Sequence, residues 1–260
     1  MKILFIGDIV GKVGRRVLSG LLHKVIDQYK VDFCIANCEN AAGGFGINVD
    51  IARTLLDFDI NILTSGNHIW NKKEALELLT KEKRILRPAN YPEEVPGRGS
   101  MVTETASGDK IGIINLSGRV FMDSLDCPFK VAVREIENIG AESKVIVVDM
   151  HAEATSEKVA MGWYLDGRVS AVIGTHTHVQ TADVKILPGG TAYITDIGMT
   201  GPSDSVIGIK KELAIQRFLT RIPKKFETAK GIGQLNGVIV EIAQDSGVAK
   251  GIERIQIGYE

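Results

Sequence analysis

The segment Lys2-Ile3-Leu4-Phe5-Ile6-Gly7-Asp8 opens the chain as a short apolar run that ends in a carboxylate. This run predicts a buried strand, and apolar residues at helical spacing follow it from about 13 to 29. The same alternation continues, with further strands at 33–36 and 61–64 and helices near 49–58 and 72–80. Because strands alternate with helices, the opening predicts a parallel sheet.

The pattern changes after Pro88. Adjacent strands are predicted at 101–105 and 110–116, and further strands at 144–150, 169–173, 237–243 and 251–259. Helices are predicted at 152–164 and 209–219, and a hairpin joins 184–187 to 191–194. No repeat, low-complexity linker or composition change marks a boundary. The sequence therefore predicts a single domain spanning residues 1–260.

Composition restricts the class of protein. The chain is 44% hydrophobic and 24% charged, which is normal for a soluble globular protein. Its formal charge of −1 and lack of basic runs argue against long nucleic acid as a partner. No stretch reaches the roughly 18 apolar residues of a membrane span, and no signal peptide is visible. The three cysteines lack metal-type spacing, so we expect reduced thiols and a cytoplasmic location.

Polar side chains gather where the predicted strands end. Four of the five histidines follow strands directly, and only His23 lies within a predicted helix. The strand-end residues are Asp8, Glu39, Asn40, Asn67, His68, His151, His176 and His178. In open α/β sheets, ligands bind outside the carboxyl ends of strands, so we expect these side chains to share one edge.

Each of these residues also has a purely structural reading. Asp8 could be a helix N-cap, Asn67 and His68 could cap the next helix, and His176 with His178 could form a turn. Their joint occurrence favours a site. Imidazoles and carboxylates together suit zinc, iron or manganese. The candidates outnumber the four ligands of a tetrahedral site and fit two ions about 3.5–4 Å apart.

The ordered motifs resemble those of the calcineurin-like metallophosphoesterases. These are Gly7-Asp8, Glu39-Asn40, Gly66-Asn67-His68, His151 and Gly174-Thr175-His176-Thr177-His178. The stretches 7–11, 37–44, 151–158 and 195–202 resemble the YmdB-like bacterial phosphodiesterase branch over essentially the whole chain. The resemblance implies a four-layer α-β-β-α sandwich of two mixed sheets.

The resemblance also implies a dinuclear metal centre. Asp8, Glu39 and His178, with Asn40 as a further candidate, would hold one ion. Glu39, Asn67, His151 and His176 would hold the other, with Glu39 as the bridge and a bridging hydroxide as nucleophile. The chain departs from the general family pattern at Val10, where a histidine ligand is usual, and at Glu39, which replaces an aspartate.

The function that the resemblance implies is hydrolysis of a small phosphodiester, with a 2′,3′-cyclic or 3′,5′-cyclic nucleotide as substrate. His68 would act as general acid, iron or manganese is favoured over zinc, and a homo-oligomer is expected. One alternative is a non-catalytic metal-binding signalling protein on the same scaffold. A metal-free nucleotide-binding protein is disfavoured, because neither 43–49 nor 7–13 completes a phosphate-binding glycine motif. The loops 41–48 and 198–208 are the predicted mouth of the site.

Overall fold

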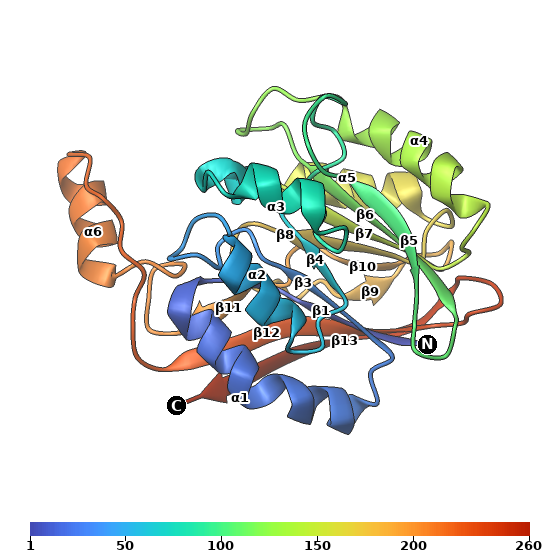
Figure 1. The fold of residues 1–260 in the computed structure, drawn as a ribbon, viewed down its shortest axis with the longest axis horizontal. Coiled ribbons are helices and arrows are strands. Elements are labelled where there is room, and N and C mark those ends of the chain that lie inside the picture. Colours follow the sequence, from blue (N-terminus) through green and yellow to red (C-terminus); the bar gives the residue numbers. More distant parts are fainter.

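The computed structural model describes residues 1–260, in which two β-sheets face each other and helices cover their outer sides (Figure 1). The first sheet has seven strands in the order β2-β11-β12-β1-β3-β4, with β13 paired to β12. These strands are β1 (Lys2–Ile6), β2 (Asp8–Ile9), β3 (Phe33–Asn37), β4 (Ile62–Thr64), β11 (Met199–Pro202), β12 (Gly233–Ile242) and β13 (Ala249–Tyr259). β1, β3 and β4 are parallel, as predicted, and β12 runs antiparallel to β1.

The second sheet has six strands in the order β5-β6-β7-β8-β10-β9. They are β5 (Ser100–Glu104), β6 (Lys110–Ser117), β7 (Ile146–His151), β8 (Ala171–Thr175), β9 (Lys185–Ile186) and β10 (Ala192–Ile194). The predicted antiparallel pairs β5–β6 and β9–β10 are both present, on either side of a parallel centre. The predicted pair of mixed sheets is confirmed.

The outer layers contain α1 (Gly11–Tyr29), α2 (Val49–Leu56) and α3 (Ala75–Lys81) on the first sheet, and α4 (Pro128–Gly140) and α5 (Thr155–Leu165) on the second. A short 3-10 helix, η1 (Asn67–Asn71), precedes α3. The last helix, α6 (Lys211–Thr220), projects from the body (Figure 1). No helix is long and apolar enough to cross a membrane.

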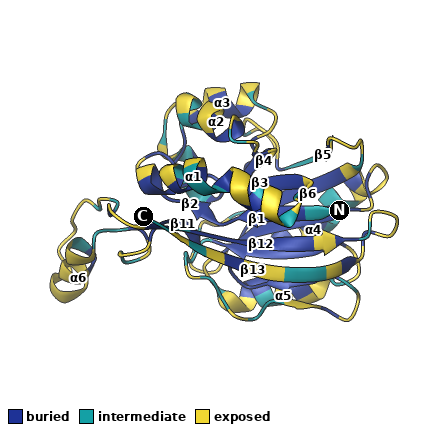
Figure 2. Ribbon diagram, turned by 90° about the horizontal axis from the view of Figure 1, so that it is seen from below, coloured by how far each residue is buried: buried dark blue, intermediate teal, exposed yellow.

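The strand period of two divides the core into layers. Along β1, Ile3 and Phe5 face the second sheet, whereas Leu4 and Ile6 face the helices of the first layer. A third cluster, which includes Val148 and Met161, lies between the second sheet and its helices. Figure 2 shows the dark, buried strands inside and the exposed faces of the helices outside. The four-layer α-β-β-α sandwich is therefore confirmed.

Two elements differ from the sequence prediction, and the alternative reading of Asp8 as a helix cap is excluded. The expected loop 198–208 contains β11, which pairs with both β2 and β12. Helix α4 was not predicted, although Pro128 begins it at a position that favours helix starts. Asp8 lies in β2 and does not cap α1, because the N-cap residue is Val10.

Candidate metal centre

The strand ends bring the predicted side chains to one edge of the two sheets. Asp8 follows β1, Glu39 and Asn40 follow β3, and Asn67 and His68 lie in η1 after β4. From the second sheet, His151 ends β7, and His176 and His178 follow β8. The candidate ligands therefore come from both sheets and meet at the carboxyl ends of their parallel strands.

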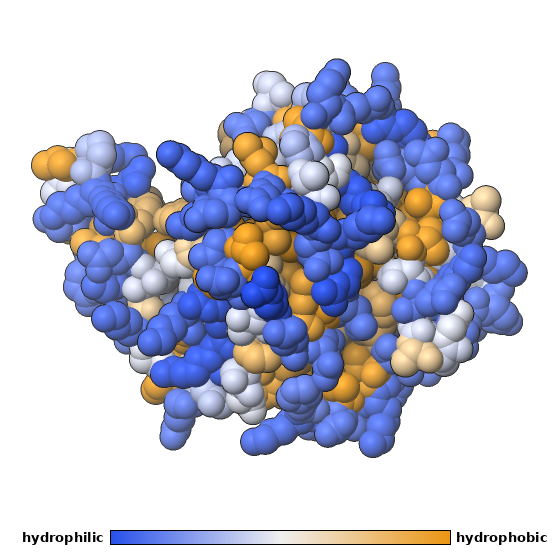
Figure 3. Space-filling model, viewed as in Figure 1, coloured by the Kyte–Doolittle hydropathy of each residue, from blue (hydrophilic) through white to orange (hydrophobic).

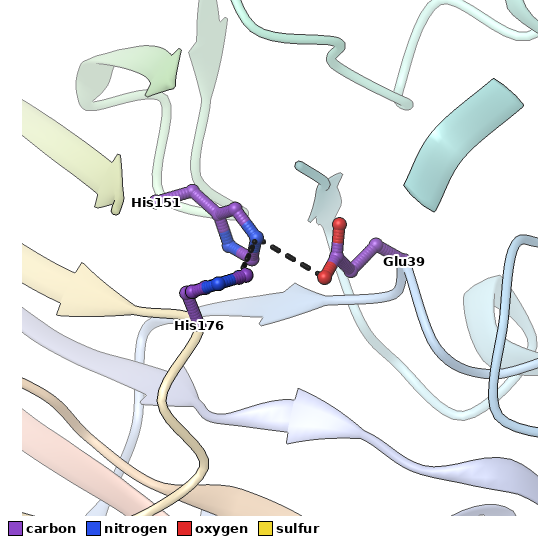
Figure 4. A group of neighbouring side chains, drawn as sticks. All are labelled: Glu39, His151 and His176. Atoms are coloured by element: carbon purple, nitrogen blue, oxygen red, sulfur yellow. Dashed lines mark hydrogen bonds and ion pairs between the residues drawn. The ribbon is translucent and has the colours of Figure 1, made fainter. Parts of the chain in front are cut away.

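Glu39, His151 and His176 form the centre of the cluster (Figure 4). His151 Nε2 is 3.1 Å from Glu39 Oε1 and 3.0 Å from His176 Nδ1. One ligand atom from each residue lies within 4.8 Å of the others, so the three side chains could hold a metal ion. Asn67 Oδ1 extends this group, at 3.3 Å from His151 Nε2.

Asp8, Asn40 and His178 form a second group beside it. His178 Nε2 is 3.1 Å from Asn40 Nδ2 and 3.8 Å from Asp8 Oδ1. Asn40 Nδ2 also donates to Glu39 Oε1 at 3.2 Å, which joins the two groups. All seven predicted ligands therefore lie in one continuous cluster with Glu39 between its halves.

Two oxygen atoms of this cluster have no partner within the protein. Asp8 Oδ1 and Asn40 Oδ1 are buried and make no hydrogen bond. Buried polar atoms in native proteins are nearly always paired, so these two atoms call for an additional ligand. A cation would satisfy both oxygens, and the mixed nitrogen and oxygen donors around them suit a transition metal. The residues present therefore fit a metal centre.

The backbone of the site is restricted at Gly66, where a side chain would not fit, and at His176 and His178, which have unusual φ angles. A Cβ on Gly66 would lie 2.1 Å from His151 Cδ2 and 2.5 Å from Glu39 Oε2. His176 and His178 have positive φ angles of 102° and 66°, which are uncommon outside glycine. Strained backbone of this kind is concentrated at functional sites.

Burial and close charges set the protonation of the cluster. Burial raises the pKa of Asp8, although the nearby imidazole of His178 acts in the opposite direction. Burial also raises the pKa of Glu39, but the charge and hydrogen bond of His151, together with the charge and backbone N–H of His68, outweigh burial and the net shift is downward. Burial lowers the pKa of His176, and the neighbouring His151 lowers it further. The pKa values of all three groups therefore differ from their usual values.

The residues behind His151 were not predicted from the sequence. Thr175 Oγ1 is 2.8 Å from His151 Nδ1 and donates to Asp149 Oδ1 at 2.7 Å. Asn37 Nδ2 donates to the other oxygen of Asp149 at 3.2 Å. This chain of contacts orients the ring of His151 so that Nε2 faces the cluster. An aspartate within the apolar strand 144–150 was the signal that could have identified it.

A buried ion pair supports the loop that carries His176 and His178. Lys158 Nζ lies 2.8 Å from Asp196 Oδ2 and donates to the carbonyl of Thr175 at 3.2 Å. Asp196 Oδ2 also accepts from the backbone and hydroxyl of Thr177, at 2.9 and 2.7 Å. The pair therefore fixes Thr175, which precedes the two histidines, and Thr177, which lies between them.

His68 lies at the edge of the cluster and does not cap a longer helix with its side chain. Its backbone N–H donates to Glu39 Oε2 at 2.9 Å, and its ring meets the ring of Phe45 edge-on at 4.9 Å. The carboxylate of Glu153 lies 3.0 Å from His176 Nε2. Both side chains face the opening of the site.

A cavity of about 260 Å³ opens over the cluster. Its polar lining includes Glu39, Asn40, His68, Glu153, His176 and His178, and its apolar lining is Val10, Phe45, Ile207, Ile209 and Phe226. The predicted mouth loops 41–48 and 198–208 both contribute. A larger cavity of about 480 Å³ lies between α2 and α3 and contains none of the candidate ligands.

The four-layer fold and the His, Asn and carboxylate cluster at its strand ends define a metallophosphoesterase. The model of the YmdB-like protein family matches residues 4–255. The chain belongs to this family.

Individual relatives agree with this assignment. A 2′,3′-cyclic-nucleotide 2′-phosphodiesterase from Bacillus subtilis is 48% identical over 257 residues, covering 99% of this chain and 97% of the relative. A Thermus thermophilus protein superposes with a TM-score of 0.94 at 40% identity and full coverage of both chains. A phosphatase from Mycoplasma pneumoniae superposes with a TM-score of 0.93 at 37% identity, covering 99% of this chain and 93% of the other.

Proposed function

We propose that the protein is a phosphodiesterase that opens the cyclic phosphate of a small nucleotide, with 2′,3′-cyclic nucleotides as the favoured substrates. The observation that carries the proposal is the pair of buried, unpartnered oxygens of Asp8 and Asn40 beside the Glu39–His151–His176 cluster. The Bacillus subtilis relative, similar over nearly the whole chain, is named for action on 2′,3′-cyclic nucleotides.

The cluster divides into the donors for two ions. Asp8, Glu39, Asn40 and His178 would hold one, and Glu39, Asn67, His151 and His176 would hold the other. When bound, two such ions would lower the pKa of a water toward about 7 and neutralise charge on the phosphoryl oxygens. Nitrogen and oxygen donors suit iron, manganese and zinc alike, and we favour iron or manganese because the resemblance to the YmdB-like branch implies them.

We assign to His68 the role of general acid, which donates a proton to the leaving oxygen of the substrate. Its imidazole borders the cavity and makes no hydrogen bond within the protein, so it is free to meet an oxygen of the substrate. Hydrolysis adds water to phosphorus and breaks one phosphorus–oxygen bond, which leaves an alkoxide that needs a proton. An imidazolium at this position would supply it. Phe45 restricts the movement of the ring from one side.

We also propose that the chain acts as one domain, in the cytoplasm, as a homo-oligomer. Pairing of β1 with β12 joins the two ends of the sequence in one sheet, which supports a single folding unit. Three unpaired cysteines suit a reducing compartment. The exposed Phe218 and Leu219 on the projecting helix α6 support contact with another subunit.

Metal analysis combined with hydrolysis assays tests the proposal. We expect about two ions per chain, cleavage of bis-p-nitrophenyl phosphate in preference to p-nitrophenyl phosphate, and loss of activity with chelator that Mn²⁺ or Fe²⁺ restores. Comparing the rates on 2′,3′-cyclic AMP and 3′,5′-cyclic AMP then identifies which cyclic phosphate is preferred. Two ions without cleavage of any diester would favour the non-catalytic alternative. No bound metal after reconstitution would overturn the assignment of the cluster.

A further inference from the structure

The cavity over the cluster has an apolar side that the metal chemistry does not use. Ile207, Ile209 and Phe226 line it together with several candidate ligands, and Ile207 is 50% exposed. Phosphate and metal ions gain nothing from apolar side chains in contact with water. An exposed apolar surface beside a polar site instead indicates an apolar part of the ligand.

The apolar side is built from two segments that hydrogen-bond to each other. Isolated bridges pair Ile209 with Val206 and with Thr228. The N–H of Ala229 donates to the carbonyl of Gly208 at 2.9 Å, which fixes the second segment against the first. A Cβ on Gly44 would lie 2.6 Å from the Thr228 methyl group, so the other mouth loop touches this wall directly.

Ile207 is held in a conformation that β-branched residues rarely adopt. Its φ angle is 45°, in the left-handed region, where a branched Cβ is strained. In this conformation its carbonyl accepts a hydrogen bond from His178 Nδ1 at 2.8 Å, which leaves His178 Nε2 facing Asn40 and Asp8. The same residue therefore orients a candidate ligand and presents an apolar side chain to the cavity.

One face of the Phe226 ring is covered by a cationic side chain. The guanidinium of Arg217, on α6, lies 4.6 Å from the centre of the ring. A cation on one face holds an aromatic ring in place and leaves the other face free for a stacking partner. Helix α6 thus contributes to the site although it projects from the body, and Figure 3 shows that its surface is mixed, with hydrophobic and hydrophilic parts.

We propose that Phe226, Ile207 and Ile209 form the subsite for the nucleobase of the substrate, with Phe226 as its stacking surface. This inference rests on the proposed function, because it requires a cyclic nucleotide whose phosphate lies at the ligand cluster. Every nucleobase has a π face, so stacking on Phe226 accepts purines and pyrimidines alike. The subsite lowers KM for nucleotides and takes no part in the bond-breaking step.

Kinetics of Phe226→Ala test the subsite. On 2′,3′-cyclic AMP we expect KM to rise about tenfold with kcat unchanged, the usual scale for losing one base–aromatic stack. On glycerol 1,2-cyclic phosphate, which has no base, we expect no change. Phe226→Tyr keeps the ring and should keep the wild-type KM. Phe121→Ala is the matched control, because Phe121 is also an aromatic side chain, is 90% exposed and does not line the cavity.

Binding of adenosine 3′-monophosphate provides a readout that is independent of turnover. Saturation-transfer NMR should show the base protons in contact with the wild type and the Phe226→Tyr variant, and lose that signal in Phe226→Ala. If Phe226→Ala leaves both KM and the NMR signal unchanged while the wild type cleaves both substrates, the subsite is wrong and the enzyme assignment stands. If the wild type cleaves neither substrate, the proposed function fails and the subsite with it.

Discussion

The imidazole of His68 is distinguished from the other strand-end histidines by its lack of polar partners. His151, His176 and His178 each contact a carboxylate, an amide or another imidazole, whereas the ring of His68 makes no hydrogen bond or ion pair and meets the ring of Phe45 edge-on. A group that coordinates a cation must face the cluster, and a proton donor must face the substrate. This difference in environment is the basis for giving His68 a different role.

Replacement of this side chain should separate metal binding from turnover. In His68→Ala the backbone N–H that donates to Glu39 remains, so the cluster keeps its shape. We expect wild-type metal content and a fall in kcat of about 10²–10⁴-fold, the usual contribution of a general acid. Steady-state kinetics and elemental analysis of the same preparation measure both.

His23→Ala is the control for this variant, since the His23 side chain is 62% exposed on α1 and lies outside the cavity. It should behave as the wild type in both measurements. Unchanged kcat in His68→Ala with full metal content would remove His68 from the mechanism.

Individual ligands could be predicted from the sequence because each follows a strand. The positions of Asp8, Glu39, Asn67 and His151 depend only on where β1, β3, β4 and β7 end. Phe226 could not be predicted in this way, because it lies in irregular chain after α6. Its place in the cavity depends on contacts between residues far apart in sequence, such as Lys210 with Glu227 and Gly208 with Ala229.

At the scale of elements, the loop after β8 depends on a charge pair that comes from α5 and from the end of β10. Lys158 and Asp196 are both fully buried, and each also bonds the loop directly. Neither was a candidate in the sequence, since the stretches 151–158 and 195–202 are distant along the chain. Only the pairing of β8 with β10 brings them together.

Breaking this pair should destabilise the protein and loosen the site. In Lys158→Met the carboxylate of Asp196 stays buried without its partner, which costs about 3 kcal/mol of unfolding free energy. Metal affinity should fall as well, because the loop that carries His176 and His178 loses its support. Chemical denaturation of the metal-free protein and metal titration measure the two effects.

Lys81→Met is the comparison, because Lys81 pairs with Glu77 on the exposed surface of α3. An exposed pair within one helix contributes little, so this variant should resemble the wild type in both measurements. If Lys158→Met were no more damaging than Lys81→Met, the buried pair would have no supporting role.

Two of the elements that the sequence did not predict, β2 and β11, are defined by tertiary contact. β2 has only two residues, and it is a strand because Asp8 and Ile9 pair with Met199 and Thr200 of β11. The Gly-rich composition of 198–208 indicates a loop, and pairing with β12 overrides that local preference. Strands such as β7 and β12 contain long apolar runs of their own, and both were predicted from those runs.

For the molecule as a whole, the candidate ligands connect the two sheets. Asp8, Glu39 and Asn67 come from the first sheet, whereas His151 and His176 come from the second. Ions bound among them would link the halves of the sandwich in the folded state only. Ligands that bind only the native state stabilise it by mass action.

Removal of metal should therefore lower the melting temperature of the whole chain. At free metal 100-fold above Kd, the loaded protein gains about 2.7 kcal/mol per ion. Differential scanning calorimetry with metal and with chelator should show one transition that moves upward on loading. Identical melting temperatures in both conditions would mean that the cluster does not hold a cation tightly.

The pairing of β1 with β12 also determines when the enzyme can first work during its own synthesis. β1 lies in the middle of its sheet between β12 and β3, and the amino group of Met1 donates to the carbonyl of Ile242. A nascent chain on the ribosome therefore carries an incomplete sheet until β12 emerges. β11, which holds Asp8 in β2, is also made late. β12 must be made before the sheet that carries Asp8 and Glu39 is complete, and a chain cut short before β12 would leave β1 unpaired on one side and prone to aggregate.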